Sequence, residues 1–82
     1  MKYNIIFKKK ALKFILKQPK NQQNRIMDAI EKLPEGDIVP VETTDKFRLR
    51  VGHYRILFTI DNNILKIVIV NAGNRGQIYK DI

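Results

Sequence analysis

The stretch KFRLRV, residues 46–51, alternates strictly between basic and apolar side chains. Successive side chains of a β-strand point to opposite faces of the sheet. The alternation therefore predicts a strand with one apolar face and one cationic face. The apolar face would carry Phe47, Leu49 and Val51, and the cationic face would carry Lys46, Arg48 and Arg50.

Two more strands are predicted after this one, with short turns between them. Gly52 and His53 form a two-residue turn signal, and an apolar segment follows it directly. The turn formers DNN, residues 61–63, then precede a run rich in β-branched residues. Strands joined by such short turns form an antiparallel meander, and the segment YNIIF adds a strand at the N-terminus. The predicted strands are residues 3–7, 46–51, 54–60 and 64–71.

Apolar residues recur at helical spacing in the N-terminal third of the chain. Residues 7–15 place them at i, i+4, i+7 and i+8, which is the spacing of one buried helical face. Residues 26–33 carry a second stripe, and Pro19 between the two interrupts helical hydrogen bonding. We therefore predict a helical hairpin with helices over residues 8–18 and 21–33. The residues expected on the two stripes are Phe7, Ala11, Phe14, Ile15, Ile26, Ile30 and Leu33.

The order of the elements indicates the fold class. The segment PEGDIVPVETTD, residues 34–45, holds two prolines, a glycine and several turn formers, so it is predicted as a loop from the helices to the strands. Helices in one half and strands in the other indicate an α+β fold. We expect an antiparallel sheet, a three-strand meander plus the N-terminal strand, with the helical hairpin on one face. A length of 82 residues fits one small domain, residues 1–82.

Composition excludes several classes of protein. The chain has no cysteine and one histidine, so a disulfide framework and a thiolate metal site are excluded and no cofactor is expected. No apolar run approaches the length of a membrane span, and the first ten residues lack the apolar core of a secretory signal. These features predict a soluble, cytoplasmic protein.

The charge indicates an anionic partner. Sixteen lysines and arginines against eight acids give a net charge of +8, and four of the five arginines lie in the C-terminal half. A sheet of the predicted order would gather these arginines and Tyr79 at one end of its open face. Arginine offers phosphate a bidentate fork, so a nucleic-acid backbone fits this cluster. Solvated arginines, or an interface for an acidic protein, are the other interpretations, and composition alone does not separate them. The four arginines are Arg48, Arg50, Arg55 and Arg75.

Three stretches resemble the RelE/ParE superfamily of bacterial and archaeal toxins. They are ALKFILKQPKNQQNRIMDAIEKL, FRLRVGHYRILF and NAGNRGQIYKDI, in this order along the chain. The most specific part is RLRVGHYRILF. The resemblance implies the toxin of a type II toxin–antitoxin pair, silenced by an acidic antitoxin. The RelE branch cleaves messenger RNA in the ribosomal A site, whereas the ParE branch inhibits DNA gyrase.

The resemblance also implies roles for individual residues. Arg48 and Arg50 match the paired basic residues on a central strand of RelE-like nucleases. Arg55 matches the arginine after Gly-x-Tyr, and Arg75 and Tyr79 match the C-terminal pair. The implied catalytic residues are Arg55, Arg75 and Tyr79, and the implied substrate-binding residues are Lys46, Arg48, Arg50 and His53.

The general base is left open by this assignment. Some relatives have lysines at the paired positions, and a lysine can act as a base when its pKa is lowered. Arginine, with a pKa above about 12, is a poor base. Tyr79 would serve only if the arginines lowered its pKa, and it would otherwise stack on a nucleobase. His53 is the other candidate, because histidine titrates near neutral pH.

Three functions are compatible with these residues. The first is a ribosome-dependent mRNA endonuclease, or mRNA interferase, in which the 2'-OH attacks the adjacent phosphate without a metal; its partners are mRNA and the ribosomal RNA. The alternative is a ParE-like inhibitor that binds DNA gyrase without catalysis. A relative that has lost catalysis and only binds is the third.

Overall fold

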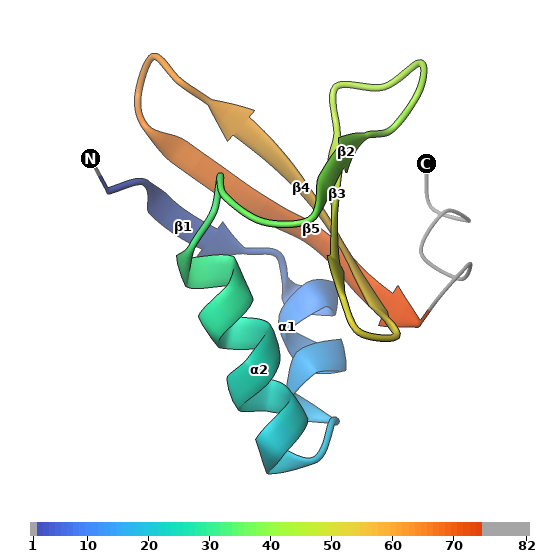
Figure 1. The fold of residues 1–82 in the computed structure, drawn as a ribbon. Helices are drawn as coiled ribbons and strands as arrows, with labels where there is room; N and C mark the ends of the chain where they lie inside the picture. Colours follow the sequence, from blue (N-terminus) through green and yellow to red (C-terminus); the bar gives the residue numbers. More distant parts are fainter. Residues whose placement is uncertain (1, 75–82) are drawn as a thin grey trace.

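Two helices lie against one face of a five-stranded sheet in the computed structural model, which describes residues 2–74 (Figure 1). The α+β class predicted from the order of the elements is confirmed. The elements are β1 (Asn4–Phe7), α1 (Lys9–Leu16), α2 (Lys20–Glu31), β2 (Ile38–Pro40), β3 (Phe47–Val51), β4 (Tyr54–Asp61) and β5 (Lys66–Asn74).

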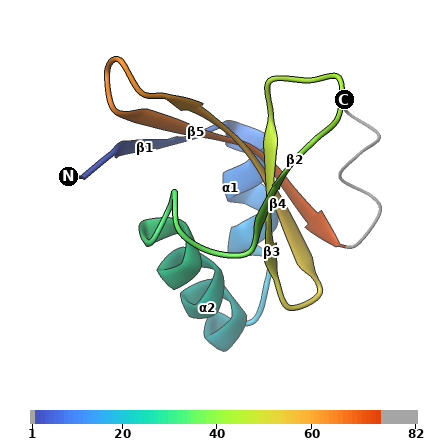
Figure 2. The same ribbon diagram turned by 45° about the horizontal axis from the view of Figure 1, so that its top comes forward.

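The sheet has the strand order β1-β5-β4-β3-β2. Strands β3, β4 and β5 form the predicted antiparallel meander. β1 instead runs parallel to β5, with Asn4 opposite Lys66 and Phe7 opposite Ile69, and the two strands lie side by side in Figure 2. The sheet is therefore mixed, and the prediction of an entirely antiparallel sheet was wrong for β1. A parallel pair needs a long crossover, and the helical hairpin supplies part of it.

β2 is a strand within the segment that was predicted as a loop. Ile38 pairs with Leu49, and Pro40 pairs with Phe47, at the edge of the sheet. Proline cannot donate a ladder hydrogen bond, so it is tolerated only in such edge positions. The prediction failed because three residues show too little alternation to indicate a strand. Their hydrogen bonds come from β3, not from a local pattern.

The helical hairpin is confirmed, with shorter helices than the sequence predicted. The amide of Gln23 in α2 donates to the backbone carbonyls of Leu16 (3.2 Å) and Gln18 (2.8 Å). The amide of Gln18 donates to the carbonyl of Phe14 at 3.0 Å. Side chains thus satisfy carbonyls at the end of α1 that another helical turn would otherwise bond. Pro19 then precedes the first residue of α2.

β5 begins two residues later than predicted. The Asp61 carboxylate accepts hydrogen bonds from the backbone N–H of Asn63 (3.0 Å) and of Ile64 (3.4 Å). This places Ile64 in the turn, where it is exposed, and the strand starts at Lys66. The sequence prediction treated the apolar side chain of Ile64 as the first of the strand.

β5 also continues past its predicted end at Asn71. Gly73 pairs with Arg55, and Asn74 pairs with Tyr54. The sequence prediction ended the strand at residue 71, two residues before this glycine. The glycine is accommodated in the strand because Arg55 of β4 pairs with it.

The core lies between the helices and one face of the sheet. Leu49 and Val51 are buried toward the helices, whereas Arg50 is exposed, so the alternation predicted for β3 is confirmed. Both helical stripes also contribute buried residues. Within residues 2–74, no helix is long and apolar enough to cross a membrane. The core residues are Ala11, Ile15, Ile26, Ile30, Leu33, Leu49, Val51, Ile56, Phe58, Ile67, Ile69 and Ala72.

Candidate functional site

Three of the predicted site residues share the sheet face that points away from the helices. Arg48 and Arg50 alternate with buried residues of β3, so both point to that face. Arg50 lies directly opposite Arg55 of β4 in the antiparallel register. Arg48 lies two residues further along the same face, opposite Leu57. The fold therefore brings Arg48, Arg50 and Arg55 together across two strands.

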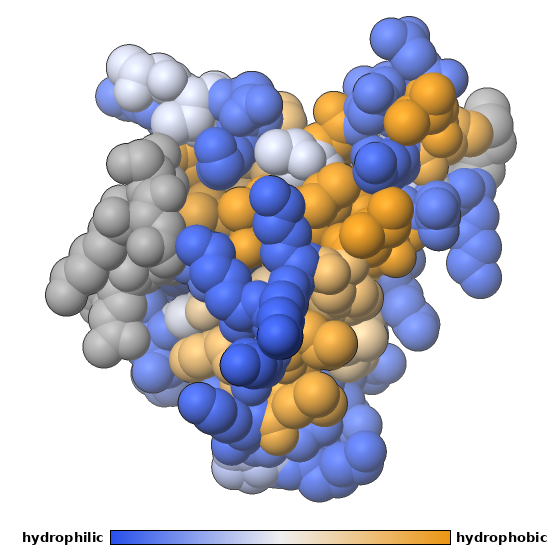
Figure 3. Space-filling view, turned by 180° about the vertical axis from the view of Figure 1, so that it is seen from behind, coloured by the Kyte–Doolittle hydropathy of each residue, from blue (hydrophilic) through white to orange (hydrophobic). Residues whose placement is uncertain are grey.

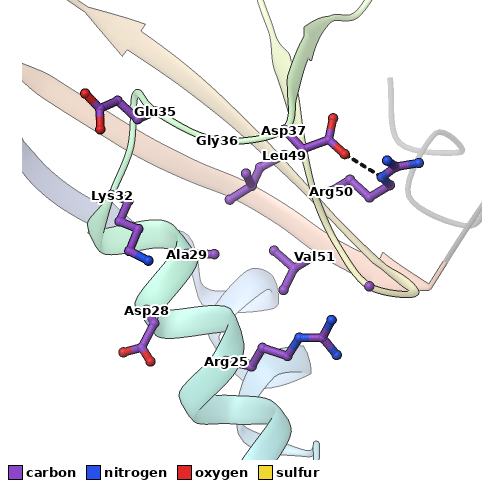
Figure 4. A pocket seen from close by; sticks show the side chains of 11 residues that line it. Arg25, Asp28, Ala29, Lys32, Glu35, Gly36, Asp37, Leu49, Arg50 and Val51 are labelled. Carbon is purple, nitrogen blue, oxygen red and sulfur yellow. Dashed lines mark hydrogen bonds and ion pairs between the residues drawn. The ribbon is translucent and has the colours of Figure 1, made fainter.

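Arg50 and Arg55 carry like charges on opposed positions, a pairing that destabilises a sheet. Each has a nearby acceptor. The Nε of Arg50 donates to Oδ2 of Asp37 at 2.6 Å, as Figure 4 shows. The Nη1 of Arg55 donates to the backbone carbonyls of Gly52 (3.1 Å) and Tyr54 (3.0 Å). The two guanidinium groups are thus drawn to different acceptors, one a carboxylate and the other a pair of carbonyls.

The face that carries these arginines is less open than the alternation predicted. Leu57 is 1% exposed although it lies on this face, and Asn71 opposite it is 8% exposed. Arg48 beside Leu57 is only partly exposed. Arg50 at the other end of β3 has a side chain 53% exposed. The accessible part of the cationic face therefore lies toward the turn between β3 and β4.

Lys46 and His53 lie beyond opposite ends of β3. Lys46 precedes the strand, and its Nζ is 3.5 Å from the carboxylate of Asp45. His53 is exposed in the turn after the strand. A five-residue strand spans roughly 17 Å. The structure therefore separates these two residues, and His53 alone is near the accessible end of the arginine face.

Gly52 allows this turn to be tight. Its φ is +59°, and His53 has no positive φ, which is the pattern of a type II′ hairpin turn. The predicted two-residue turn is confirmed. The predicted catalytic residues Arg75 and Tyr79 lie outside the described residues. β5 is described as far as Asn74, which pairs with Tyr54 at this same end of the sheet.

Two charged residues near this turn were not singled out from the sequence. Arg25 of α2 reaches the turn, because a Cβ at residue 52 would lie 3.1 Å from its Nη1. Asp37 contacts Arg50 from the loop before β2. Both line a cavity of about 430 Å³ between α2 and β3 (Figure 4). No sequence signal indicated either contact, because the partners are 27 and 13 residues apart.

Metal binding has no obvious place in the described part of the chain. Within residues 2–74, no three His, Cys, Asp or Glu side chains are grouped so that they could hold a metal ion. The described part of the chain brings to this site guanidinium groups, the exposed imidazole of His53, the carboxylate of Asp37 and backbone carbonyls.

No family profile and no curated protein sequence matches this chain. Solved structures do. A chain of the archaeal RelE–RelB complex from Pyrococcus horikoshii OT3 has a TM-score of 0.77 and 26% identity, covering 94% of this chain and 99% of that chain. A chain of the RelBE2 toxin–antitoxin complex from Mycobacterium tuberculosis has a TM-score of 0.71 and 25% identity, covering 92% and 100%.

The isolated RelE toxin of E. coli shows which partner of such complexes has this fold. It has a TM-score of 0.66 and covers 96% of this chain and 93% of that chain, at 15% identity. A toxin crystallised without its antitoxin thus shares the architecture. The chain shares the fold of the RelE-like toxin superfamily. The resemblance indicated by the sequence is confirmed, and the arginine face lies on β3 and β4 of a RelE-like fold.

Proposed function

We propose that this RelE-like chain is the toxin of a type II toxin–antitoxin pair, and that it acts in the cytoplasm by cleaving messenger RNA on the ribosome. The observation that supports the proposal is the pairing of Arg50 with Arg55 on the accessible part of the sheet. Two opposed guanidinium groups suit a ligand with closely spaced negative charges, such as a nucleic-acid backbone. The RelE-like fold favours RNA as that ligand.

The proposed reaction needs no metal. The ribose 2'-OH gives its proton to a base as its oxygen attacks the adjacent phosphorus, and a pentacoordinate phosphorane forms. The bond to the 5'-oxygen then breaks as that oxygen takes up a proton, which leaves a 2',3'-cyclic phosphate on one fragment and a 5'-OH on the other. Such a reaction requires a proton acceptor, cations beside the phosphorane and a proton donor. Arg55 is assigned to the phosphorane together with Arg75, and Arg48 and Arg50 to the neighbouring backbone. Tyr79 is the proposed proton-transfer residue.

His53 and Lys46 have lesser roles in this proposal. His53 is exposed at the accessible end of the arginine face, so it is assigned to substrate contact. Lys46 is at the far end of β3 and is half-enclosed, with Asp45 as its partner. We assign it to electrostatic attraction of the RNA backbone, because a lysine contributes a mobile point charge to such binding.

Surface composition supports an antitoxin as the second partner. The face seen in Figure 3 carries apolar surface between polar side chains. Among the exposed large hydrophobic residues are Ile6 of β1 and Leu12 and Leu16 of α1. Apolar surface on a chain with a net charge of +8 fits a partner that combines apolar side chains with carboxylates. Electrostatic steering should make its association faster at low salt.

The decisive experiment measures cleavage of message on programmed ribosomes beside supercoiling by DNA gyrase, each with and without an acidic antitoxin. The proposal expects cleaved message, unaffected gyrase and loss of cleavage when the antitoxin is added. Intact message together with inhibited gyrase would reject the nuclease and favour the ParE-like alternative. If message cleavage were the same with and without each acidic protein tested, the proposal of an antitoxin partner would be rejected.

A further inference from the structure

The loop residue Asp37 is fixed on β3 by its backbone. Its carbonyl accepts a hydrogen bond from the backbone N–H of Arg50 at 2.9 Å. Gly36 before it has a φ of +139°, and a Cβ there would lie 3.1 Å from the Cδ1 of Leu49. The peptide segment is thus seated against the strand whatever the residue 37 side chain does. A substitution that changes only that side chain should leave the segment in place.

The carboxylate of Asp37 contacts one edge of the Arg50 guanidinium. Oδ2 accepts from Nε at 2.6 Å. Among residues 2–74, Asp37 provides the side-chain partner of this guanidinium, and the contact engages Nε alone. In Figure 4 the dashed line joins the Asp37 carboxylate to a single nitrogen of the guanidinium. Nη1 and Nη2, which together carry four N–H donors, belong to a side chain that is 53% exposed, so they are available to an acceptor from outside.

A guanidinium held in this way is prepared for an anion. Arg50 is repelled by Arg55 across the strand pair, and a free arginine side chain samples many rotamers. Holding Nε fixes the plane of the guanidinium, and two parallel N–H groups on its far edge match two phosphate oxygens. We propose that Asp37 is a positioning residue that holds Arg50 by Nε and so presents its Nη1–Nη2 edge to a phosphodiester. The choice of RNA as the phosphodiester rests on the proposed function.

The Asp37 carboxylate orders the Arg50 guanidinium, but it also has an electrostatic effect that opposes anion binding. Its negative charge repels an approaching phosphate, so an acid at this place would weaken RNA binding if it did no more than neutralise Arg50. The two effects predict opposite results for the removal of Asp37. Glu35 provides a control for the charge, because it is an exposed acid in the same loop whose carboxylate has no hydrogen bond or ion pair among residues 2–74.

The first test compares kcat/KM for RNA cleavage among Asp37→Ala, Asp37→Asn and Glu35→Ala. Both alanine variants lose one negative charge, so Glu35→Ala measures the charge effect. Asp37→Ala should fall below Glu35→Ala by roughly 2- to 10-fold, the cost of ordering one long side chain at binding. Asp37→Asn retains an oxygen acceptor for Nε and should recover most of the loss.

The same comparison in an Arg50→Ala background shows whether Asp37 acts through Arg50. The difference between Asp37→Ala and Glu35→Ala should disappear there, as a double-mutant cycle requires for residues that act together. A difference that persists in that background would overturn the inference. So would an Asp37→Ala variant that cleaves as fast as Glu35→Ala or faster.

The second test does not depend on cleavage. The Nε–Hε NMR signal of Arg50 should be protected from exchange in the wild-type protein and exposed in Asp37→Ala. Inorganic pyrophosphate or a 2'-O-methyl oligoribonucleotide should shift the Nη signals while the Nε–Hε signal stays protected. Loss of that protection on binding would mean that the anion displaces Asp37, and the inference would be wrong. A wild-type protein that binds pyrophosphate as described but cleaves no RNA would contradict the proposed function and leave this inference standing.

Discussion

The two faces of the β3–β4 hairpin differ more than their shared sequence would suggest. On the helix side, Leu49 pairs with Ile56 and both are almost completely buried. On the other side, Arg50 pairs with Arg55 one register position away. Adjacent residues of one strand therefore belong either to the core or to a cationic surface. Near the turn, stability and the proposed chemistry therefore lie on opposite faces of the hairpin, and single substitutions there should separate them; further along, the buried Leu57 shares the face of the arginines.

The largest expected effect comes from the buried face. Phe58 is fully buried, and its ring stacks on Phe47 with centroids 5.7 Å apart. Phe58→Ala should lower the free energy of unfolding by about 3–5 kcal/mol, because it removes transfer free energy and leaves a cavity. Urea unfolding measures this. Thr59→Ala, one residue along on the other face, is the matched control and should cost far less. Similar losses for the two variants would contradict the separation of the faces.

The largest effect on the cleavage rate is expected from Arg55, although its free-energy equivalent is smaller than the loss expected for Phe58→Ala. A charge-assisted contact is worth about 1.5–3 kcal/mol, so Arg55→Ala should lower the cleavage rate by roughly 10- to 150-fold. The rate should fall more than ribosome binding, if Arg55 holds the phosphate more tightly in the transition state. Single-turnover cleavage and a binding assay separate the two quantities. Arg55→Lys is the control, because it keeps the positive charge without the bidentate guanidinium. If Arg55→Ala lowered the rate and the binding affinity by the same factor, Arg55 would be a binding residue only.

Arg55→Ala also removes two hydrogen bonds to the carbonyls of Gly52 and Tyr54. The unfolding free energy of this variant must therefore be measured beside its rate. A rate loss with unchanged stability supports the catalytic role, whereas a large stability loss would assign Arg55 to the turn.

The turn that joins the two faces should be sensitive to a single methyl group. Gly52 has a φ of +59°, and a Cβ there would contact the guanidinium of Arg25. Gly52→Ala should lower the free energy of unfolding by about 1–2 kcal/mol, chiefly through the left-handed backbone. Most of this loss should remain in an Arg25→Ala background. If Arg25→Ala abolished it, the side-chain contact and not the backbone would be its cause.

The smallest effect is expected from a lysine away from both faces of the hairpin. Lys13 is exposed in the last turn of α1. If it contacts one phosphate, Lys13→Ala should reduce the slope of log affinity against log salt by about 0.7 and leave the single-turnover rate unchanged. Binding titrations at several salt concentrations measure the slope. A change in rate at saturating RNA would give Lys13 a role in catalysis that its position does not suggest.

Sequence patterns predicted the elements whose periodicity is long enough to be distinctive. The helical stripes, the Gly52–His53 turn and the faces of β3 all agree with the structure. Patterns failed where an element was short or depended on a distant partner. The three-residue strand β2 was predicted as a loop, and Ile64 was placed in β5 although the Asp61 carboxylate holds it in a turn.

The candidate site was predicted in part for the same reason. Alternation placed Arg48 and Arg50 on one face, and the hairpin turn brought Arg55 opposite Arg50. The burial of Leu57 on that face was not predicted, because alternation gives the direction of a side chain and not what covers it. The roles assigned to these arginines, and to Arg75 and Tyr79, remain predictions from the resemblance.

The sequence by itself determined the periodic structure, the cationic face and the resemblance to RelE-like toxins, because each is carried by residues close together in the chain. Only the tertiary structure decided that β1 runs parallel to β5, that Asp37 holds Arg50 and that Arg25 reaches Gly52. These contacts join residues 13 or more positions apart. These contacts form only when packing brings distant segments together. A local pattern of apolar and polar residues does not indicate which segments those are.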